Sequence, residues 1–338
     1  MRPASILGWT GNGSLEDLAR TAVGKLGEGA TLERGARSLV VRGVDPVAAA
    51  HRLDRLPGVA WIAAGYDFEG LDRGVARLSS LASSYLGDGG SFRVTAEVGA
   101  GAGVEEGDVL MEATSALLKA KKGAHLDEKD PSVWFRMVLT RKGRGVCGVQ
   151  LREGPGGVPT ARGMAATCLV SGGYHSAVVA WMAALSGYSL ALVHSRDGDD
   201  GSLRQVARLY AELSHRMDPA ALGLRVLGGK GTPGGRLVAW LGTARGEVFA
   251  GAHPECRGEE GLRALRRRRP SIVFPLFLLQ EAEVGSKLRG LALGQRAGDG
   301  SPTLDLTGRG GGDRPTVRTF GGVESDQNAV LDSILAQG

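Results

Sequence analysis

The segment from Thr167 to Ser176 combines the residue types that hold a phosphate group. An apolar run, Thr167-Cys-Leu-Val, leads into Ser171-Gly-Gly, and Ser176 follows three residues later. Glycines let backbone N–H groups approach an anion, serine hydroxyls donate hydrogen bonds, and the N-terminus of a following helix adds its positive dipole end. The pattern predicts a strand, a phosphate-binding turn and a helix. The predicted nucleotide-binding residues are Ser171, Gly172, Gly173 and Ser176.

Further polar residues surround this turn. His175 lies inside it, while His194 ends the next apolar run and is followed by Asp197, Asp199 and Asp200. At the carboxyl edge of a parallel sheet the two histidines would face one crevice, where imidazoles contact phosphate or transfer protons. His194 is therefore predicted to bind the nucleotide together with the four residues of the turn. The carboxylates are either Mg²⁺ ligands or a solvated acidic loop, and we favour the loop. The turn has neither a P-loop lysine nor a G-x-G-x-x-G pattern, which argues against a Walker NTPase or a dinucleotide fold.

Basic residues gather in two parts of the chain, and arginine forks fit phosphate oxygens. We expect a nucleic-acid backbone as the partner, which the net charge of +5 permits. The alternative for the second set is a solvated helix end before Pro270. The predicted RNA-binding residues are Lys119, Lys121, Lys122, Arg141, Lys142 and Arg144 in the first set, and Arg266 and Arg267 in the second, which extends from Arg263 to Arg269.

The three cysteines show no metal-ligand spacing, so the sequence predicts no metal site, and their odd number argues against a disulfide framework. Cys256 lies beside Arg257 and is a candidate nucleophile, because a nearby cation favours the thiolate. Cys168 lies in an apolar run and is predicted to pack in the core. The 338 residues are 42% hydrophobic and 23% charged, which is typical of a soluble protein. With no signal-peptide core and no membrane-length apolar run, we expect no membrane partner and a cytoplasmic location.

The elements that would position these groups form three blocks and a tail. Residues 1–65 are predicted to be a small α+β unit with helices over 15–26 and 46–56 and strands over 38–42 and 59–64. Residues 66–155 are predicted to contain helices over 71–86 and 104–121 and strands over 91–98, 133–140 and 146–151. Strands over 167–170, 189–194 and 222–227 alternate with helices over 176–185 and 203–216, which predicts an α/β doubly wound parallel sheet in residues 156–295. The Gly-rich tail, 296–338, is expected to be loose as far as residue 323.

The junction before the turn carries a family resemblance. Arg152-Glu-Gly-Pro-Gly-Gly-Val-Pro159, followed by Leu169-Val-Ser-Gly-Gly-Tyr-His-Ser176, resembles the tRNA 4-thiouridine sulfurtransferases. In that family a Gly-X-Gly-Gly-X-Pro linker joins a THUMP domain to a PP-loop ATP-pyrophosphatase domain, whose loop reads Ser-Gly-Gly-X-Asp-Ser. The resemblance covers about 1–290. It implies a ferredoxin-like domain over 1–65, a THUMP RNA-binding domain over 66–155 and a Rossmann-like PP-loop domain over 156–295.

The resemblance also implies an activity. The first two domains would hold the acceptor stem of tRNA, and the PP-loop would bind ATP with Mg²⁺ and adenylate the uridine 4-oxygen. A persulfide would then deliver sulfur, from the chain itself or from an external donor such as a cysteine desulfurase. The resemblance also implies a third role, sulfur transfer in thiamine biosynthesis, which some family members have. A homodimer is left open by the sequence.

Two departures from the family pattern keep a second interpretation open. His175 stands where the family loop has an aspartate, and no cysteine follows Cys256, although the family's sulfur-carrying cysteine lies near the end of the PP-loop domain. His175 and Cys256 are the candidate catalytic residues of an enzyme with reduced activity. The alternative is a catalytically inactive paralogue that binds tRNA without modifying it.

Overall fold

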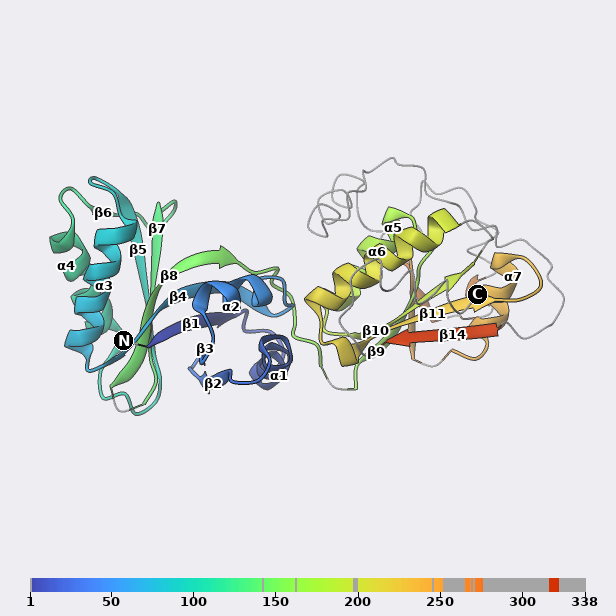
Figure 1. Cartoon of the computed structure of the whole chain (residues 1–338), viewed down its shortest axis with the longest axis horizontal. Coiled ribbons are helices and arrows are strands. Elements are labelled where there is room, and N and C mark those ends of the chain that lie inside the picture. Colours follow the sequence, from blue (N-terminus) through green and yellow to red (C-terminus); the bar gives the residue numbers. More distant parts are fainter. Residues whose placement is uncertain are drawn as a thin grey trace. The chain divides into compact units, whose positions relative to one another are not determined.

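The chain forms two compact units, residues 1–159 and residues 160–338, shown in the computed structural model of Figure 1. The structure describes residues 2–141, 143–161, 163–196, 200–244, 246–251, 265–267, 269, 271–275 and 316–321. Among these residues, no helix has the length and apolar character needed to cross a membrane.

The first unit contains an eight-stranded mixed sheet in the order β2-β3-β1-β4-β8-β7-β5-β6. Its first half follows the chain order β1-α1-β2-β3-α2-β4 with antiparallel pairs, which is the ferredoxin-like arrangement. The strands are β1 (Pro3–Trp9), β2 (Thr31–Arg34), β3 (Ser38–Arg42), β4 (Val59–Glu69), β5 (Ser91–Val98), β6 (His125–Leu126), β7 (Val133–Leu139) and β8 (Arg144–Glu153).

Four helices cover one face of this sheet. They are α1 (Leu15–Leu26), α2 (Pro46–Leu53), α3 (Leu71–Tyr85) and α4 (Glu106–Ala120). The first two begin at side-chain caps, because Ser14 Oγ accepts from the amides at positions 16 and 17, and Asp45 accepts from the amide of Ala48. Ile62 of β4 packs in the core under α1 and α2, and Phe68 packs in the core under α3 and α4. Because side chains alternate along a strand, these two residues point to the same face.

The opposite face of the sheet is concave. Ile6 of β1 and Val138 of β7 are fully buried there in a cluster to which no helix of the described residues contributes. The buried carboxylate of Glu97 on β5 accepts hydrogen bonds from Arg37 N (2.7 Å) and Ser38 Oγ (3.0 Å) at the start of β3. Four strands lie between β3 and β5 in the sheet order. The sheet must therefore curl for these residues to meet.

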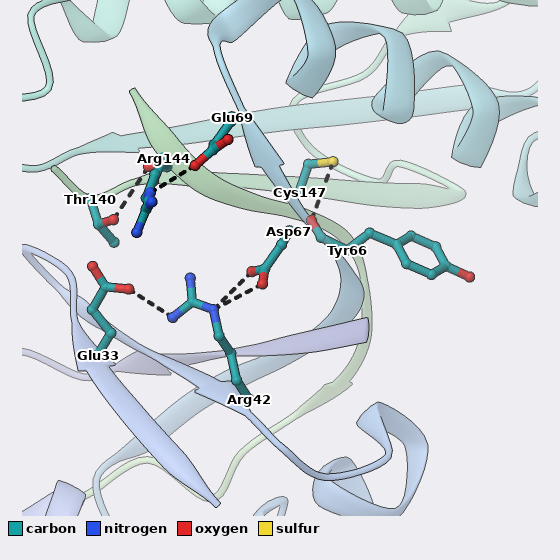
Figure 2. Close-up of polar contacts among 8 residues, drawn as sticks. All are labelled: Glu33, Arg42, Tyr66, Asp67, Glu69, Thr140, Arg144 and Cys147. Atoms are coloured by element: carbon teal, nitrogen blue, oxygen red, sulfur yellow. Dashed lines mark hydrogen bonds and ion pairs between the residues drawn. The ribbon is translucent and has the colours of Figure 1, made fainter. Parts of the chain in front are cut away.

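An arginine on the same concave face joins three strands, as Figure 2 shows. Arg42 of β3 donates to both carboxylate oxygens of Asp67 on β4 (2.9 and 3.0 Å) and to Glu33 of β2 (2.7 Å). Nearby, Arg144 of β8 donates to Glu69 of β4 at 3.0 Å. β4 runs through residue 65 without a break, so the expected division there falls inside a strand that pairs with both halves of the sheet. The separation into two domains at that point stays a prediction.

The segment expected to be a linker, 154–159, is bonded to the first unit. Three backbone hydrogen bonds of 2.7–2.9 Å join Gly154 and Gly156 to residues 58–60. The hydroxyl of Thr10 donates to the carbonyl oxygen of Gly157 at 2.9 Å. The segment therefore continues β8 alongside residues 58–60 of the first unit. We call residues 154–159 the strap.

Glycine is required for this strap to lie so close. A Cβ at Gly58 would stand 2.4 Å from Cγ of Pro159, and Gly58 has φ +89°. In the second unit, the amide of Ala161 already donates to the carbonyl of Gly187 at 2.9 Å. Only residue 160 therefore separates the last strap residue from the first residue bonded within the second unit.

The second unit is an α/β unit with helices on both faces of its sheet. The strand order is β13-β12-β9-β10-β11-β14, and all the pairs are parallel except the one with β14. α5 and α6 pack against Cys168 and Leu192 on one face, while α7 packs against Leu169 and Val193 on the other. The elements are β9 (Ala165–Leu169), α5 (Tyr174–Leu185), β10 (Ser189–Ser195), α6 (Asp200–Arg216), β11 (Leu222–Gly228), α7 (Pro233–Leu241), β12 (Glu247–Ala250), β13 (Ile272–Val273) and β14 (Thr316–Gly321).

The structure corrects the sequence-based prediction for the Gly-rich tail. Residues 316–321, expected to be loose, form β14, which pairs antiparallel with β11 at the edge of the sheet. Pairing with a strand formed almost 100 residues earlier supplies backbone partners that local sequence does not reveal. The expected helix over 46–56 is also shorter, since α2 ends at Leu53.

Candidate functional site

The predicted phosphate turn lies at the carboxyl end of β9, between that strand and α5. Gly172 has φ +90°, a conformation that residues with a side chain rarely adopt. Ser171 Oγ accepts from the amide of Gly173 (3.3 Å), and Ser176 Oγ donates to the carbonyl of Gly173 (2.8 Å). The two hydroxyls are 3.5 Å apart. The structure thus brings the four predicted residues of the turn together, and their contact with a nucleotide stays a prediction.

The turn also lies where the strand order reverses. β10 pairs with one side of β9 and β12 with the other. In open parallel sheets, ligands bind at the carboxyl ends of the strands at such a reversal. α5 starts after Gly173, so the positive end of its dipole lies at this position. The arrangement fits an anion such as a nucleotide phosphate.

Two other segments approach the turn within backbone contact. A Cβ at Gly172 would lie 2.7 Å from the carbonyl oxygen of Ser202 in α6. A Cβ at Gly251, just after β12, would lie 2.5 Å from both N and Cα of Ser176. Glycines at positions 172 and 251 therefore allow α6 and the segment after β12 to lie in close backbone contact with the turn.

Both predicted histidines lie at this edge of the sheet and both are buried. His175 is 6% exposed, and its ring lies 4.0 Å from the ring of Tyr174 with an interplanar angle of 34°. His194 is 1% exposed, and its Nδ1 lies 2.9 Å from the carbonyl oxygen of Val170. Because a carbonyl only accepts, Nδ1 carries the proton in this bond. His194 therefore joins the end of β10 to the end of β9, and its contact with a nucleotide stays a prediction.

The cysteines of the described residues do not suit sulfur transfer. Cys147 and Cys168 are buried, and burial raises the pKa of each thiol to about 12. A persulfide carrier needs an accessible thiolate, which these sites disfavour. Cys256, the candidate nucleophile, lies outside the described residues, as do Asp197 and Asp199. Within the described ranges, no group of three or more His, Cys, Asp or Glu residues could hold a metal ion.

The predicted RNA-binding residues of the first unit that the structure describes lie in two groups, one near each end of β7. α4 ends beside the start of β5, where the carbonyl of Lys122 accepts from Gly89 N at 3.0 Å. β5 and β7 are parallel, so the turn after β7 lies at the other end, about 23 Å away at 3.3 Å per residue. The structure does not bring the two sets into one patch. Lys119, Lys121 and Lys122 lie at the α4 end, Arg141 and Arg144 lie at the turn, and Lys142 lies outside the described residues.

Several of these cations have partners. Lys121 lies 3.9 Å from Asp88, and Arg144 is bonded to Glu69. In the second unit Arg266 and Arg267 are exposed, and the Arg266 guanidinium lies 5.3 Å from the centre of the Phe274 ring. An arginine stacked on an aromatic ring keeps its charge available to phosphate. RNA binding by these residues stays a prediction.

Sequence reasoning missed a stack of arginines and tryptophans on the concave face of the first unit. The guanidinium of Arg136 lies between the rings of Trp61 (4.1 Å) and Trp134 (4.4 Å), and Arg93 lies 5.0 Å from Trp134. Burial lowers the pKa of Arg136 to about 10. The stack borders a cleft of about 420 Å³ that Glu97 also lines. Alternation along β5 and β7 indicates from the sequence that Arg93, Trp134 and Arg136 point away from the helices. Trp61 lies beside them only because β8 pairs with both β4 and β7, which the sequence does not reveal.

Comparison with known proteins adds fold-level information. No protein-family model matches the sequence, and neither does any curated protein. PH1313 from Pyrococcus horikoshii Ot3 has a similar structure, with 17% identity and a TM-score of 0.68 over 86% of this chain and 99% of that one. A 4-thiouridine synthetase–RNA complex with bound ATP is 15% identical, with a TM-score of 0.65 over 100% of this chain and 95% of that one. These two likenesses show a similar fold.

Proposed function

We propose that this protein binds tRNA through its first unit and uses ATP in its second unit to replace a uridine 4-oxygen by sulfur. The observation that carries the proposal is the Ser171–Ser176 turn at the carboxyl end of β9, where the strand order reverses. The similarity to a 4-thiouridine synthetase solved with RNA and ATP, which extends along the whole chain, supports it.

The residues of the turn fit the phosphates of ATP. The hydroxyls of Ser171 and Ser176 would hold them, and the positive end of the α5 dipole would add to the attraction, because both serines lie at the start of α5. ATP would supply an adenylyl group that makes the uridine 4-oxygen a leaving group, with release of pyrophosphate. We infer that Mg²⁺ enters with the triphosphate, as is usual for an ion that keeps several waters.

We further propose that sulfur comes from an external donor, such as a cysteine desulfurase. The two described cysteines are buried, with thiols whose pKa is about 12, which leaves only Cys256 as a carrier within the chain. Attack of the donor's terminal persulfide sulfur on C4 would expel AMP and leave a disulfide between the donor and the base, and a second thiol would cleave this S–S bond to release 4-thiouridine. Cysteine substitutions therefore separate the two routes: loss of activity in Cys256→Ser would favour an internal carrier over a purely external one.

The test is turnover with a matched set of variants. We expect release of AMP and pyrophosphate that depends on tRNA, and 4-thiouridine in the product by nucleoside mass spectrometry. Ser171→Ala and Ser176→Ala should each lose ATP affinity. The control is Ser186→Ala, which removes a hydroxyl from the exposed C-terminal end of the same helix. No tRNA-stimulated AMP or pyrophosphate release from the wild-type protein would refute the enzymatic proposal.

One observation favours a second candidate, a tRNA-binding protein without turnover. The residue at the loop position where the resemblance expects an aspartate is a buried imidazole packed on Tyr174. Such a protein would bind tRNA with an affinity that falls as salt rises, since phosphate contacts release counterions. Turnover that appears only in His175→Asp would support this candidate.

A further inference from the structure

Arg236, in the first turn of α7, has a guanidinium buried among backbone carbonyl groups. The residue is 8% exposed. Its Nη1 donates to the carbonyl oxygens of Gly229 (3.0 Å) and Gly231 (2.5 Å), and its Nη2 donates to that of Arg196. One side chain thus bonds to two chain segments that are more than 30 residues apart.

These segments follow neighbouring strands of the parallel sheet. Arg196 comes directly after β10, and Gly229 and Gly231 come directly after β11. Two more bonds join the same region, from Ser195 Oγ to the carbonyl of Pro233 (2.7 Å) and from Arg196 N to the carbonyl of Leu227 (3.1 Å). Arg236 therefore lies at the centre of the connection between the carboxyl ends of β10 and β11.

The same edge of the sheet carries the phosphate turn. β10 is the strand next to β9, with Val193 opposite Leu169, and the amide of Val170 donates to the carbonyl of Val193 at 2.9 Å. A residue after β10 therefore stands one strand away from Ser171. Ligands that bind at the carboxyl edge of such a sheet contact the segments after adjacent strands.

We propose that Arg236 is a positioning residue of the nucleotide site, which holds the segments after β10 and β11 in the geometry that binds the nucleotide. The proposal rests on the proposed function, because it assumes that the turn at Ser171 binds ATP. Arginine suits the role since its planar fork offers five donors in fixed directions and reaches several carbonyls at once, whereas lysine offers a compact point charge.

The test measures ATP binding by calorimetry and amide hydrogen exchange in the full-length protein. Arg236→Gln removes the charge and part of the fork, and Arg236→Lys keeps the charge. The matched control is Arg204→Gln, at an exposed position on α6. We expect about tenfold weaker ATP binding in Arg236→Gln, a smaller loss in Arg236→Lys, and none in Arg204→Gln, because binding segments that are no longer held in place must be ordered when the nucleotide binds, which weakens affinity.

The exchange readout tests the positioning itself. Amides at 228–232 and at 196 should exchange faster in Arg236→Gln, while those in the first unit keep wild-type rates. A variant that binds ATP as tightly as the wild type would overturn the proposal, and so would unchanged exchange at both segments. If the wild type binds no ATP, the proposed function fails together with this role. If the wild type binds ATP and Arg236→Gln binds it equally well, only the role of Arg236 fails. Should Arg236→Gln not fold, the comparison of Arg236→Lys with the wild type decides.

Discussion

Glu97 should hold the two halves of the eight-stranded sheet together, and Glu97→Ala tests this. The side chain is 7% exposed and lies on β5, and its two hydrogen bonds go to the start of β3. Four strands separate β3 from β5 in the sheet order. No backbone pairing connects them, so side chains must stabilise the curled shape.

The size of the effect follows from the two bonds. A hydrogen bond to a charged group contributes about 1.5–3 kcal/mol. Because one carboxylate oxygen accepts both bonds, the two contributions are not additive, and we expect Glu97→Ala to lower the free energy of unfolding by about 3 kcal/mol. Glu97→Gln keeps a carbonyl acceptor at the same position and should lose about 1 kcal/mol. These are large changes for a protein whose total stability is about 5–15 kcal/mol.

The measurement is urea denaturation combined with hydrogen exchange read by mass spectrometry. Peptides from β3 and β5 should lose protection together in Glu97→Ala, although they are about 55 residues apart in the sequence. Glu112→Ala, at an exposed position on α4, is the control and should leave both unchanged. A loss below about 0.5 kcal/mol in Glu97→Ala, the size of an ordinary surface substitution, would contradict the reasoning.

Three more predictions address the second unit and the strap. Gly172→Ala should destabilise the second unit by about 1–3 kcal/mol in thermal denaturation, because φ is +90° and the new Cβ would lie 2.7 Å from the carbonyl oxygen of Ser202; an unchanged midpoint would contradict it. On the function proposed above, four residues inserted between positions 160 and 161 should reduce tRNA modification while leaving tRNA and ATP binding intact, and full turnover in the insertion variant would show that the short connection is not needed. Neither Cys147 nor Cys168 should react with a thiol reagent at pH 8 until the protein unfolds. Since burial raises the pKa of both thiols from 9.0 to about 12, the unfolded state loses these protons first, and stability should fall as pH rises from 9 towards 12.

Local signals in the sequence predicted the elements that local energetics decide. The helix over residues 15–26 has the predicted bounds, because its cap at Ser14 and its apolar spacing are both encoded within a few residues. The strand over 91–98 and the alternating strands and helices around Ser171 were predicted for the same reason. The sequence alone therefore predicted that the turn lies between a strand and a helix.

Features that depend on distant partners were not predictable in this way. β1 was not predicted, and it pairs with β3 and β4 at positions 30 or more residues away. The segment from Gly154 to Pro159 has the composition of a flexible linker, yet its glycines allow close contact with residues 58–60. Glycine lowers the cost of close approach as well as raising flexibility, and composition alone does not separate the two. No sequence pattern indicated the role of Arg236, because its partners are backbone carbonyl groups, which every residue carries.

The same reasoning changes how the Ser-Gly-Gly turn should be interpreted. Gly172 is required by packing, because any side chain there would strike the backbone of Ser202 whether or not a nucleotide binds. Its presence is therefore evidence of the fold and not of the ligand. The hydroxyls of Ser171 and Ser176 are different. Alanine at either position would fit the same backbone and would lose only hydrogen bonds to other residues of the turn. The two serine hydroxyls are thus the part of the motif that a function would require. Loss of ATP affinity in Ser171→Ala and Ser176→Ala would indicate an ATP site, whereas unchanged affinity would indicate a turn with a structural role alone.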